Sequence, residues 1–510
     1  MGVLLRKAFS FPVMLGALLL AGVFVFARLN LTDPDSWWHT RVGERILSTS
    51  AWPTSDFYSF TVPGSDWMAY EWLGEVAMAL AMRLGGLQGM AALLIGLSGT
   101  LLLLLYYYAY LRSGNVKAAL AACLLLLPLA APIFTLRPQL LGYIFLLSTL
   151  ICLERFRQGS RKALWFLPGV FLLWVNTHGT FALGLAVMGL YGVSGLMSFS
   201  RGGLVAERWT PEQRRDLAVV FLLCVLVLPL TPYGTRLAAY PLQMAFFQPV
   251  NIANIQEWQP LPFDLLPGKL FLGVLLLFVL GQVLFPMTYR VEEIGLLLVA
   301  LYAACVHRRF LVFFVLAFAP LLATLLARWV PGYQPAKDRP AFNVALLVLI
   351  GAIIIGFFPS TQELEEIVAQ RFPQKAVEYL RQQPVAGPML NEYGWGGYLI
   401  WSRGPEHKVF IDGRADIYEY SGVLPDYLHI TRLHPDALFL LRKYRVEACL
   451  LQREAPLGTL LSALPGWEQV YVDELSALFV HKRRHHPPER TSQAASEVAH
   501  LSTVPSTIDH

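Results

Sequence analysis

The sequence predicts a polytopic α-helical membrane protein of about eleven spans with a C-terminal α/β domain. Hydrophobic residues make up 55% of the 510 residues and charged residues only 15%. That balance, with a mean hydropathy of +0.50, is too apolar for a soluble globular protein of this length. Apolar runs of roughly 17 to 25 residues, long enough to cross a bilayer, recur as far as Pro359. From Gln362 onward the sequence has the mixed composition of a soluble domain.

Three regions follow from this change in composition. Residues 1–360 form the transmembrane domain and include a first outer loop at 31–84, residues 361–482 form the soluble α/β domain, and residues 483–510 form a tail. The tail is rich in Arg, His, Pro, Ser and Thr, so we expect it to be disordered. The first apolar run, from about Phe9 to Phe26, is longer than the core of a secretory signal and lacks a clear cleavage site, which favours an uncleaved span.

Basic residues orient the spans, because short loops rich in Lys and Arg face the cytoplasm. Arg6 and Lys7 precede the first span, and the cluster from Arg155 to Lys162 marks an inner loop. Parity then places the C-terminal domain outside. The ninth and tenth spans meet at residues 307–309 with almost no turn residues between them. An amphipathic helix around Tyr70 to Leu84 is expected to lie at the outer interface.

Helix and strand patterns alternate in the soluble domain, which indicates a small α/β sandwich. The predicted elements are helices at Thr361–Gln383 and Asp436–Tyr444, and strands at Tyr398–Trp401, Lys408–Ile411, Ala448–Leu451 and Leu478–Val480.

Several classes of function are disfavoured by the sequence. The net charge of +5 comes mostly from basic residues in short turns rather than from one aromatic-rich face, so no nucleic acid partner is expected. Four of the five cysteines lie inside apolar runs, so neither a disulfide framework nor a metal-ligand spacing follows. The sequence has no H-E-x-x-H, paired C-x-x-C, nucleophile elbow or Walker loop.

The first outer loop carries the strongest chemical pattern, Asp33-Pro34-Asp35-Ser36-Trp37-Trp38-His39. Two carboxylates in a Pro-interrupted turn beside tryptophans would be partly desolvated yet reachable, and this environment suits a general base. The alternative is that both aspartates cap the following helix while the tryptophans anchor at the membrane interface.

The predicted topology also places a group of cations on the outer face, where the positive-inside rule disfavours them. These are Arg41, Arg137, His178, Arg236, His307, Arg308 and Arg309. Cations at membrane depth need an anionic partner, and the phosphate of a lipid carrier is one such partner. Alternatively, individual cations pair with Asp33, Asp35, Glu71 or Glu257 and hold helices together.

Three further segments add candidate binding residues. Asn176 and His178 end an apolar span beside a glycine that permits close approach, although a lone histidine at a helix end is often structural. Glu257, next to Trp258, offers a carboxylate and an aromatic edge suited to a sugar ring, or else belongs to an ordinary amphipathic loop. The segment Ile411 to Arg414 follows a predicted buried strand, where α/β folds place ligand groups, and we expect it to orient the domain over the membrane site.

Together these segments resemble the GT-C superfamily of membrane glycosyltransferases. The closer likeness is to a group of bacterial proteins with D-P-D-x-W-W-H, E-W-L, N-x-H-G, G-G-Y-L-I-W and I-D-G-R segments. Here they lie at 33–39, 71–73, 176–179, 396–401 and 411–414. The resemblance covers nearly the whole length up to Lys482, and it implies a multi-pass protein of the bacterial inner membrane with the C-terminal domain outside.

The resemblance implies transfer of a sugar from a polyprenyl-phosphate donor to a lipid, glycan or protein acceptor at the outer face. An acid of the first outer loop would activate the acceptor hydroxyl, and the matching position is Asp33 or Asp35, with Asp56 or Glu71 as the second acid. The outer cations would bind the lipid phosphate. No cofactor is assigned, and whether a divalent metal bridges the acids stays an open question. The alternatives are a non-catalytic translocase or assembly partner, and a surface polysaccharide polymerase or ligase.

The residues expected to contact substrate can be stated as one set. They are Trp37, Trp38, His39, Arg41, Arg137, Asn176, His178, Arg236, Glu257, His307, Arg308 and Arg309. Membrane lipids are the remaining expected partners.

Overall fold

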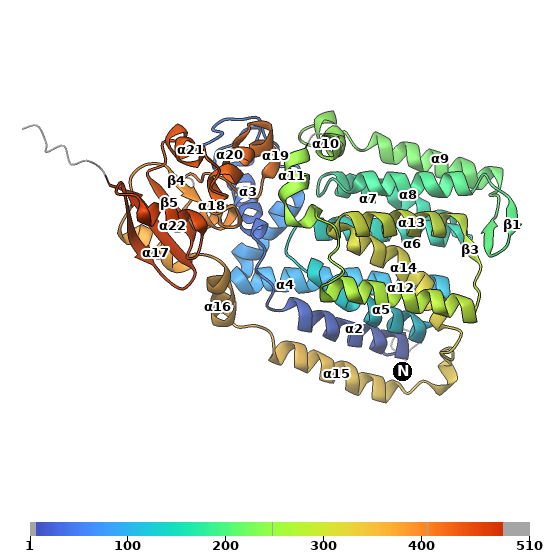
Figure 1. Ribbon diagram of the computed structural model, residues 1–510. Helices are drawn as coiled ribbons and strands as arrows, with labels where there is room; N and C mark the ends of the chain where they lie inside the picture. The colour runs from blue at the N-terminus through green and yellow to red at the C-terminus, as the bar shows by residue number, and fades with distance from the viewer. Residues whose placement is uncertain (1–6, 247, 405, 483–510) are drawn as a thin grey trace, which may run out of the picture.

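The computed structural model describes residues 7–246, 248–404 and 406–482. Figure 1 shows a bundle of roughly parallel and antiparallel helices with the C-terminal domain at one end. The predicted tail at 483–510 lies outside the described residues. A helix lies at each predicted span: α2 (Phe11–Ala27), α4 (Trp72–Ser113), α5 (Val116–Ala130), α6 (Gln139–Arg157), α7 (Leu167–Val175), α8 (Phe181–Ser194), α9 (Pro211–Leu226), α12 (Leu266–Leu284), α13 (Val291–Val306), α14 (Leu311–Leu326) and α15 (Pro340–Gly356).

The number of spans stays a prediction. By length and apolar composition alone, 5 of the described helices could cross a membrane, or up to 6 if α15 and α16 (Thr361–Arg371), which meet at a bend of 60°, count as one. Several of the other predicted spans are shorter helices, such as the 17-residue α2 and the 14-residue α8.

The position of each helix follows its sequence. The helix α14 is apolar on all sides and is buried along nearly its whole length, where it packs against α4, α5 and α13; such a helix belongs at the centre of a bundle. By contrast, α15 lies at the edge beside α2 and exposes Phe342, Val348, Leu349 and Ile355. Exposed apolar side chains on a helix of this kind suit contact with lipid.

The long helix α4 is broken at Gly86, whose φ of 57° and ψ of −140° are not helical. Only glycine adopts such a conformation at little cost. The break separates the first turns, from Trp72, from the span that follows, and it lies two residues beyond the amphipathic helix expected around Tyr70 to Leu84.

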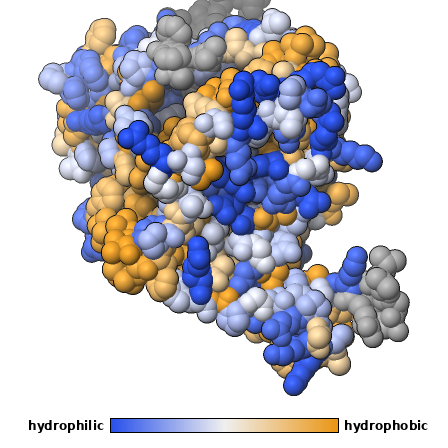
Figure 2. Space-filling view, turned by 90° about the vertical axis from the view of Figure 1, so that its right-hand side faces the viewer, coloured by the Kyte–Doolittle hydropathy of each residue, from blue (hydrophilic) through white to orange (hydrophobic). Residues whose placement is uncertain are grey.

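A small sheet and several ion pairs lie at the end of the bundle opposite the C-terminal domain. The sheet has the order β1 (Phe199–Arg201), β2 (Leu204–Ala206), β3 (Tyr289–Arg290). The ion pairs are Arg112–Glu293, Arg157–Glu292 and Arg290–Glu154. Figure 2 shows hydrophilic residues gathered on this end face, as expected where helices leave the membrane.

The C-terminal domain contains a four-stranded sheet of order β4 (Met389–Asn391), β5 (Ala448–Gln452), β7 (Ser476–His481), β6 (Trp467–Val472). The strands β4 and β5 are parallel, and the other pairs are antiparallel. The helices of the domain are α16, α17 (Gln374–Gln382), α18 (Gly396–Arg403), α19 (Ala415–Tyr420), α20 (Val423–Thr431), α21 (Ala437–Lys443) and α22 (Pro456–Ala463).

Two of the predicted strands in this domain are wrong. Residues 398–401 belong to α18, a helix whose Gly397 lies against the backbone of Pro34, so the short apolar run is buried by packing on α3 (Asp35–Thr49). Short apolar runs fit a buried helix as well as a strand. Residues 408–411 form only an isolated bridge, between Val409 and Ser59. The strands near 448 and 478 and the helix near 437 are confirmed.

The predicted first outer loop, between α2 and α4, is bound to the C-terminal domain by a buried ion cluster. The guanidinium of Arg414 contacts Asp56 Oδ1 at 2.6 Å and Asp412 Oδ2 at 2.6 Å, and all three side chains are 0% exposed or nearly so. Tyr418 donates its hydroxyl to Asp412 at 2.5 Å. Nearby, the indole of Trp37 packs among Phe372, Tyr398 and Trp401. These contacts make the loop and the domain one packed unit.

We expect Arg414→Met to destabilise the protein by about 3–5 kcal/mol, because it leaves two carboxylates buried without their cation. Thermal unfolding of the detergent-solubilised protein would measure the effect. The control is Arg442→Met, which removes an exposed arginine from the same domain and is expected to change little. Equal melting temperatures for the two variants would contradict the role assigned to the cluster.

Candidate functional site

The site lies at the end of the bundle that faces the C-terminal domain. Five connections contribute to it: the turn before α3, the α5–α6 connection, the α7–α8 connection, the connection that contains η3 (Gln256–Trp258), and the α13–α14 connection, which contains η4 (Arg308–Phe310). The predicted topology places all five on the outer side, and the structure brings their charged residues together.

At the centre, one arginine contacts three carboxylates. Arg137 places Nε 2.8 Å from Asp33 Oδ1, Nη2 2.5 Å from Asp35 Oδ2, and Nη1 2.6 Å from Glu257 Oε1. The planar guanidinium presents its donors in several directions, which a lysine does not. We call these four residues the arginine cluster. Its formal charge is −2 when every carboxyl is ionised, so the cation does not neutralise it.

The two aspartates of the cluster have different surroundings. Asp33 Oδ1 also accepts the backbone N–H of Asp35 at 2.9 Å, so Asp33 has the capping role that the sequence left open. The side chain of Asp35 is 18% exposed against 7% for Asp33. Burial, opposed by Arg137 and assisted by Asp33 and Glu257, raises the pKa of Asp35 to about 6. Asp35 is therefore the more accessible of the two, and its carboxyl is more basic than an ordinary aspartate.

A second group of buried side chains lies beside the arginine cluster. The backbone N–H of Thr180 donates to Nδ1 of His178 at 3.1 Å, so the other nitrogen, Nε2, donates to Glu71 Oε1 at 3.2 Å. His39 contacts Glu71 Oε2 with Nε2 at 3.3 Å and Glu75 Oε1 with Nδ1 at 3.1 Å. We call His39, Glu71, Glu75 and His178 the histidine cluster.

The contacts and burial of the histidine cluster indicate where its protons lie. Burial, reinforced by nearby arginines, lowers the pKa of His178 to about 3 and that of His39 well below its ordinary value. A neutral imidazole has one N–H, so His39 can donate a hydrogen bond to only one of the two glutamates that it contacts. Burial raises the pKa of Glu71 to about 8, and a protonated Glu71 supplies the missing hydrogen to His39.

Trp38 joins the two clusters. Its Nε1 donates to Asp35 Oδ1 at 3.1 Å, and its ring stacks on His39 with ring centroids 3.6 Å apart. The C-terminal domain covers the same point, because a Cβ at Gly413 would overlap Asp35 Oδ1 and lie 3.0 Å from Trp38 Nε1. The segment Ile411 to Arg414 thus lies over the membrane site, as the sequence analysis expected.

Three basic residues near residue 308 lie at the edge of the arginine cluster. The guanidinium of Arg309 lies over the ring of Trp258, 4.2 Å from its centroid, and His307 Nδ1 donates to the carbonyl of Trp258 at 2.5 Å. Both Arg308 and Arg309 lie near enough to Glu257 to lower its pKa, although burial raises it and Arg137 is the strongest of the charges that lower it.

Other predicted site residues lie apart from these clusters. Asp56 belongs to the buried ion cluster with Arg414, and Trp37 to the aromatic packing beside it. Arg41 pairs with Glu44 at 2.9 Å, and Arg236 pairs with Asp66. Asn176 accepts the indole N–H of Trp72 at 2.8 Å and donates to backbone carbonyls. The structure gives each of these residues a structural partner.

Glu75 was not singled out from the sequence. The signal was available, because a residue four positions after Glu71 lies on the same face of a helix. Its Oε2 has no hydrogen-bond partner among the described residues although it is buried, which marks it as an unusual carboxylate.

Among the comparisons with known proteins, only that with solved structures gives a match, and it bears on the fold of the chain. No family model matches the chain, and no curated protein matches it. Among solved structures, the chain resembles the oligosaccharyltransferase AglB from Archaeoglobus fulgidus, with a TM-score of 0.51 and 11% identity over 95% of this chain and 75% of that one. It also resembles ArnT from Cupriavidus metallidurans in the apo state, with a TM-score of 0.50 and 15% identity over 92% of this chain and 97% of that one.

These matches show the fold of the chain. With the apolar helices, they identify an integral membrane protein with the GT-C fold that the sequence predicted, whereas the likeness to the bacterial group with shared sequence segments stays a prediction. The particular proteins it resembles are a membrane oligosaccharyltransferase and ArnT. At these identities the likeness establishes the fold alone.

We expect the stability of the protein to depend on pH through Glu71. Its folded pKa of about 8 exceeds the ordinary 4.5, so the folded state holds more protons between these values and loses stability as pH rises through that window. Glu71→Gln imitates the protonated form, so its melting temperature relative to wild type should be higher at pH 8.5 than at pH 6, by on the order of 1–2 °C.

The control for this comparison is Glu365→Gln, which changes an exposed glutamate. If the melting temperature of Glu71→Gln relative to wild type is the same at both pH values, the assignment of the proton to Glu71 is refuted.

Proposed function

We propose that the chain is a membrane glycosyltransferase that moves a sugar from a polyprenyl-phosphate donor to an acceptor at the extracytoplasmic face. The single observation that carries this proposal is the convergence of Asp35, Arg137, Glu257 and Arg309 from separate connections at one end of a GT-C fold. Support for the donor class comes from AglB, whose solved complex contains an inhibitory peptide and a dolichol-phosphate.

Asp35 is assigned as the general base. A base must be ionised at working pH, reachable, and free to accept a proton from the acceptor hydroxyl. The pKa of about 6 at Asp35 leaves it ionised near neutrality, and its carboxyl is more exposed than that of Asp33. Asp33 positions the turn, since it caps the backbone N–H of Asp35 and binds Arg137.

The reaction assigned to the site is an inverting displacement. Asp35 takes the proton of the acceptor hydroxyl as its oxygen forms a bond to the anomeric carbon. The bond between that carbon and the phosphate oxygen breaks, and the lipid phosphate leaves with the electron pair. Arg309 and Arg308 are assigned to the leaving phosphate, because guanidinium groups bind phosphate strongly. His307, next to them in the chain, anchors the segment through its bond to the carbonyl of Trp258. The ring of Trp258 lies under the guanidinium of Arg309 and holds it in position.

A divalent cation is compatible with the arginine cluster. Hard cations prefer carboxylate oxygens, and the formal charge of −2 leaves room for added positive charge. Asp35 and Glu257, the more exposed carboxylates, would hold such an ion, which would add charge stabilisation. Loss of activity in EDTA with recovery in Mg²⁺ or Mn²⁺ distinguishes this case from catalysis by the protein residues alone.

We expect Asp35→Asn to reduce sugar transfer by about 10²–10⁴-fold, the usual contribution of a general base, while binding of polyprenyl phosphate is retained. The assay follows release of polyprenyl phosphate from a panel of polyprenyl-phosphate-linked sugars in proteoliposomes supplied with membrane extract as acceptor. Asp33→Asn should reduce sugar transfer less than Asp35→Asn does, because Asp33 positions the turn and does not accept the proton.

The matched control is Asp264→Asn, an exposed carboxylate in the same outer connection as Glu257. Wild-type turnover in Asp35→Asn would refute the base assignment. Movement of the donor lipid across the bilayer by the wild-type protein, without cleavage of the sugar–phosphate bond, would favour a translocase instead. Transfer only from donors that carry a glycan chain would favour a polymerase or ligase.

The pH profile provides an independent test. Because Asp35 must be deprotonated, kcat/KM should rise with pH through a limb near 6. Glu257 is one of the charges that raise this pKa, so Glu257→Gln should move the limb to lower pH. A limb that stays in place, or moves upward, would show that Asp35 is not the group that titrates.

A further inference from the structure

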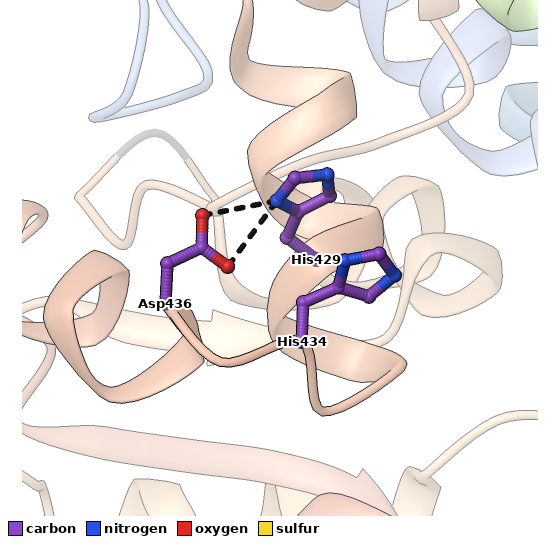
Figure 3. Close-up of side chains that lie close together, drawn as sticks. All are labelled: His429, His434 and Asp436. Carbon is purple, nitrogen blue, oxygen red and sulfur yellow. Dashed lines mark hydrogen bonds and ion pairs between the residues drawn. The ribbon is translucent and has the colours of Figure 1, made fainter.

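A cluster of three metal-ligating side chains lies in the C-terminal domain, apart from the arginine and histidine clusters. His429, His434 and Asp436 lie at the turn between α20 and α21, and their potential ligand atoms are all within 4.8 Å of one another. Figure 3 shows the two imidazoles side by side with the carboxylate directed at His429. None of these residues takes part in the proposed reaction.

The turn that carries the cluster is tightly constrained. The helix α20 ends at Thr431, and the backbone N–H of His434 donates to the carbonyl of His429 at 3.0 Å. Leu433 between them has a φ of 56°, a conformation that a branched, bulky residue rarely adopts and that costs energy. This conformation folds the chain back so that the ring of His434 stacks on that of His429, with centroids 4.2 Å apart.

The distances between His429 and Asp436 are close to those of a metal site, and the ligand atoms of all three residues lie within 4.8 Å of one another. Asp436 lies 3.0 Å (Oδ2) and 3.3 Å (Oδ1) from Nδ1 of His429. Ligand atoms of a tetrahedral zinc ion are about 3.3 Å apart, given bonds of about 2.0–2.1 Å. His434 is exposed, so a rotation of its ring that directs a nitrogen at the same point breaks only its stacking on His429. Within the described residues, that ring makes no hydrogen bond through its nitrogens.

We propose that His429, His434 and Asp436 bind a divalent transition metal ion, with Zn²⁺ as the preferred ion. Two imidazoles and one carboxylate are ligands that favour zinc and its neighbours over Mg²⁺ or Ca²⁺, which prefer oxygen alone. Three protein ligands leave further positions to water. The bound ion replaces the hydrogen bond between His429 and Asp436 with stronger bonds and ties the end of α20 to the start of α21.

The site is placed to influence the contact between the domain and the bundle. Arg432, in the same turn, donates to Asn254 Oδ1 at 2.9 Å. Asn254 ends α11 (Pro249–Asn254), which leads directly into η3 and Glu257. A metal ion that fixes this turn therefore stiffens a contact beside the arginine cluster, without being part of it.

We expect the full-length protein in detergent to bind one equivalent of Zn²⁺ at this site and to melt at a higher temperature when it is bound. The protein is purified without a polyhistidine tag and stripped with EDTA, and ZnCl₂ is titrated by calorimetry. His429→Ala, His434→Ala and Asp436→Asn should each weaken this binding at least about tenfold and abolish the rise in melting temperature. Mg²⁺ and Ca²⁺ should produce neither effect.

The control is His407→Ala, which removes an exposed histidine of the same domain and should bind Zn²⁺ as the wild type does. The sequence also contains His485, His486, His500 and His510, which offer a competing site. Equal zinc stoichiometry and affinity in wild type and His434→Ala would overturn the proposal, and loss of binding on removal of 483–510 alone would assign the ion to those histidines. The measurement requires no glycosyl transfer, so it tests the zinc site independently of the proposed function.

Discussion

The guanidinium of Arg137 is the interaction on which the rest of the site depends. Asp33 and Asp35 precede α3, Glu257 belongs to η3, and the arginine itself precedes α6. Three carboxylates brought this close would repel one another in a poorly solvated space. One cation with donors in several directions offsets this repulsion. It thereby fixes the relative positions of three connections, and more than a hundred residues separate the arginine from each of its partners in the sequence.

The same shortage of positive charge explains the chemistry assigned to the site. A single arginine cannot neutralise three carboxylates, so burial and residual repulsion raise the pKa of Asp35 to about 6 while leaving it ionised near neutrality. The histidine cluster meets a similar constraint differently: its imidazoles stay neutral and Glu71 keeps a proton. Trp38 contacts both Asp35 and His39. It therefore lies between the arginine cluster, which carries net negative charge, and the histidine cluster, whose imidazoles are neutral.

The sequence predicted the parts of this arrangement that follow from local pattern. Apolar runs located the helices, and the positive-inside rule marked Arg137 and Arg309 as cations on the disfavoured side, which is where the structure brings charged groups together. It also marked His178 as a cation, whereas burial keeps that imidazole neutral. Partners across long separations were not predictable: nothing local pairs Asp56 with Arg414, 358 positions away. Nor does a short run such as 398–401 reveal whether it will be buried as a helix or a strand, because packing against α3 decides the outcome.

The place of the C-terminal domain bears on how the proposed enzyme would select its acceptor. Gly413 leaves no room for a side chain above Asp35, and Gly397 approaches the backbone of Pro34 in the same way. The domain is held there by the buried Arg414 cluster and by the packing of Trp37. Under the proposed function, the acceptor hydroxyl must reach Asp35 beneath this domain. One wall of the acceptor site then belongs to the soluble domain, and the bundle contributes the base and the cations for the leaving phosphate. Variation in the loops of that domain would alter which acceptor is used without changing the reaction.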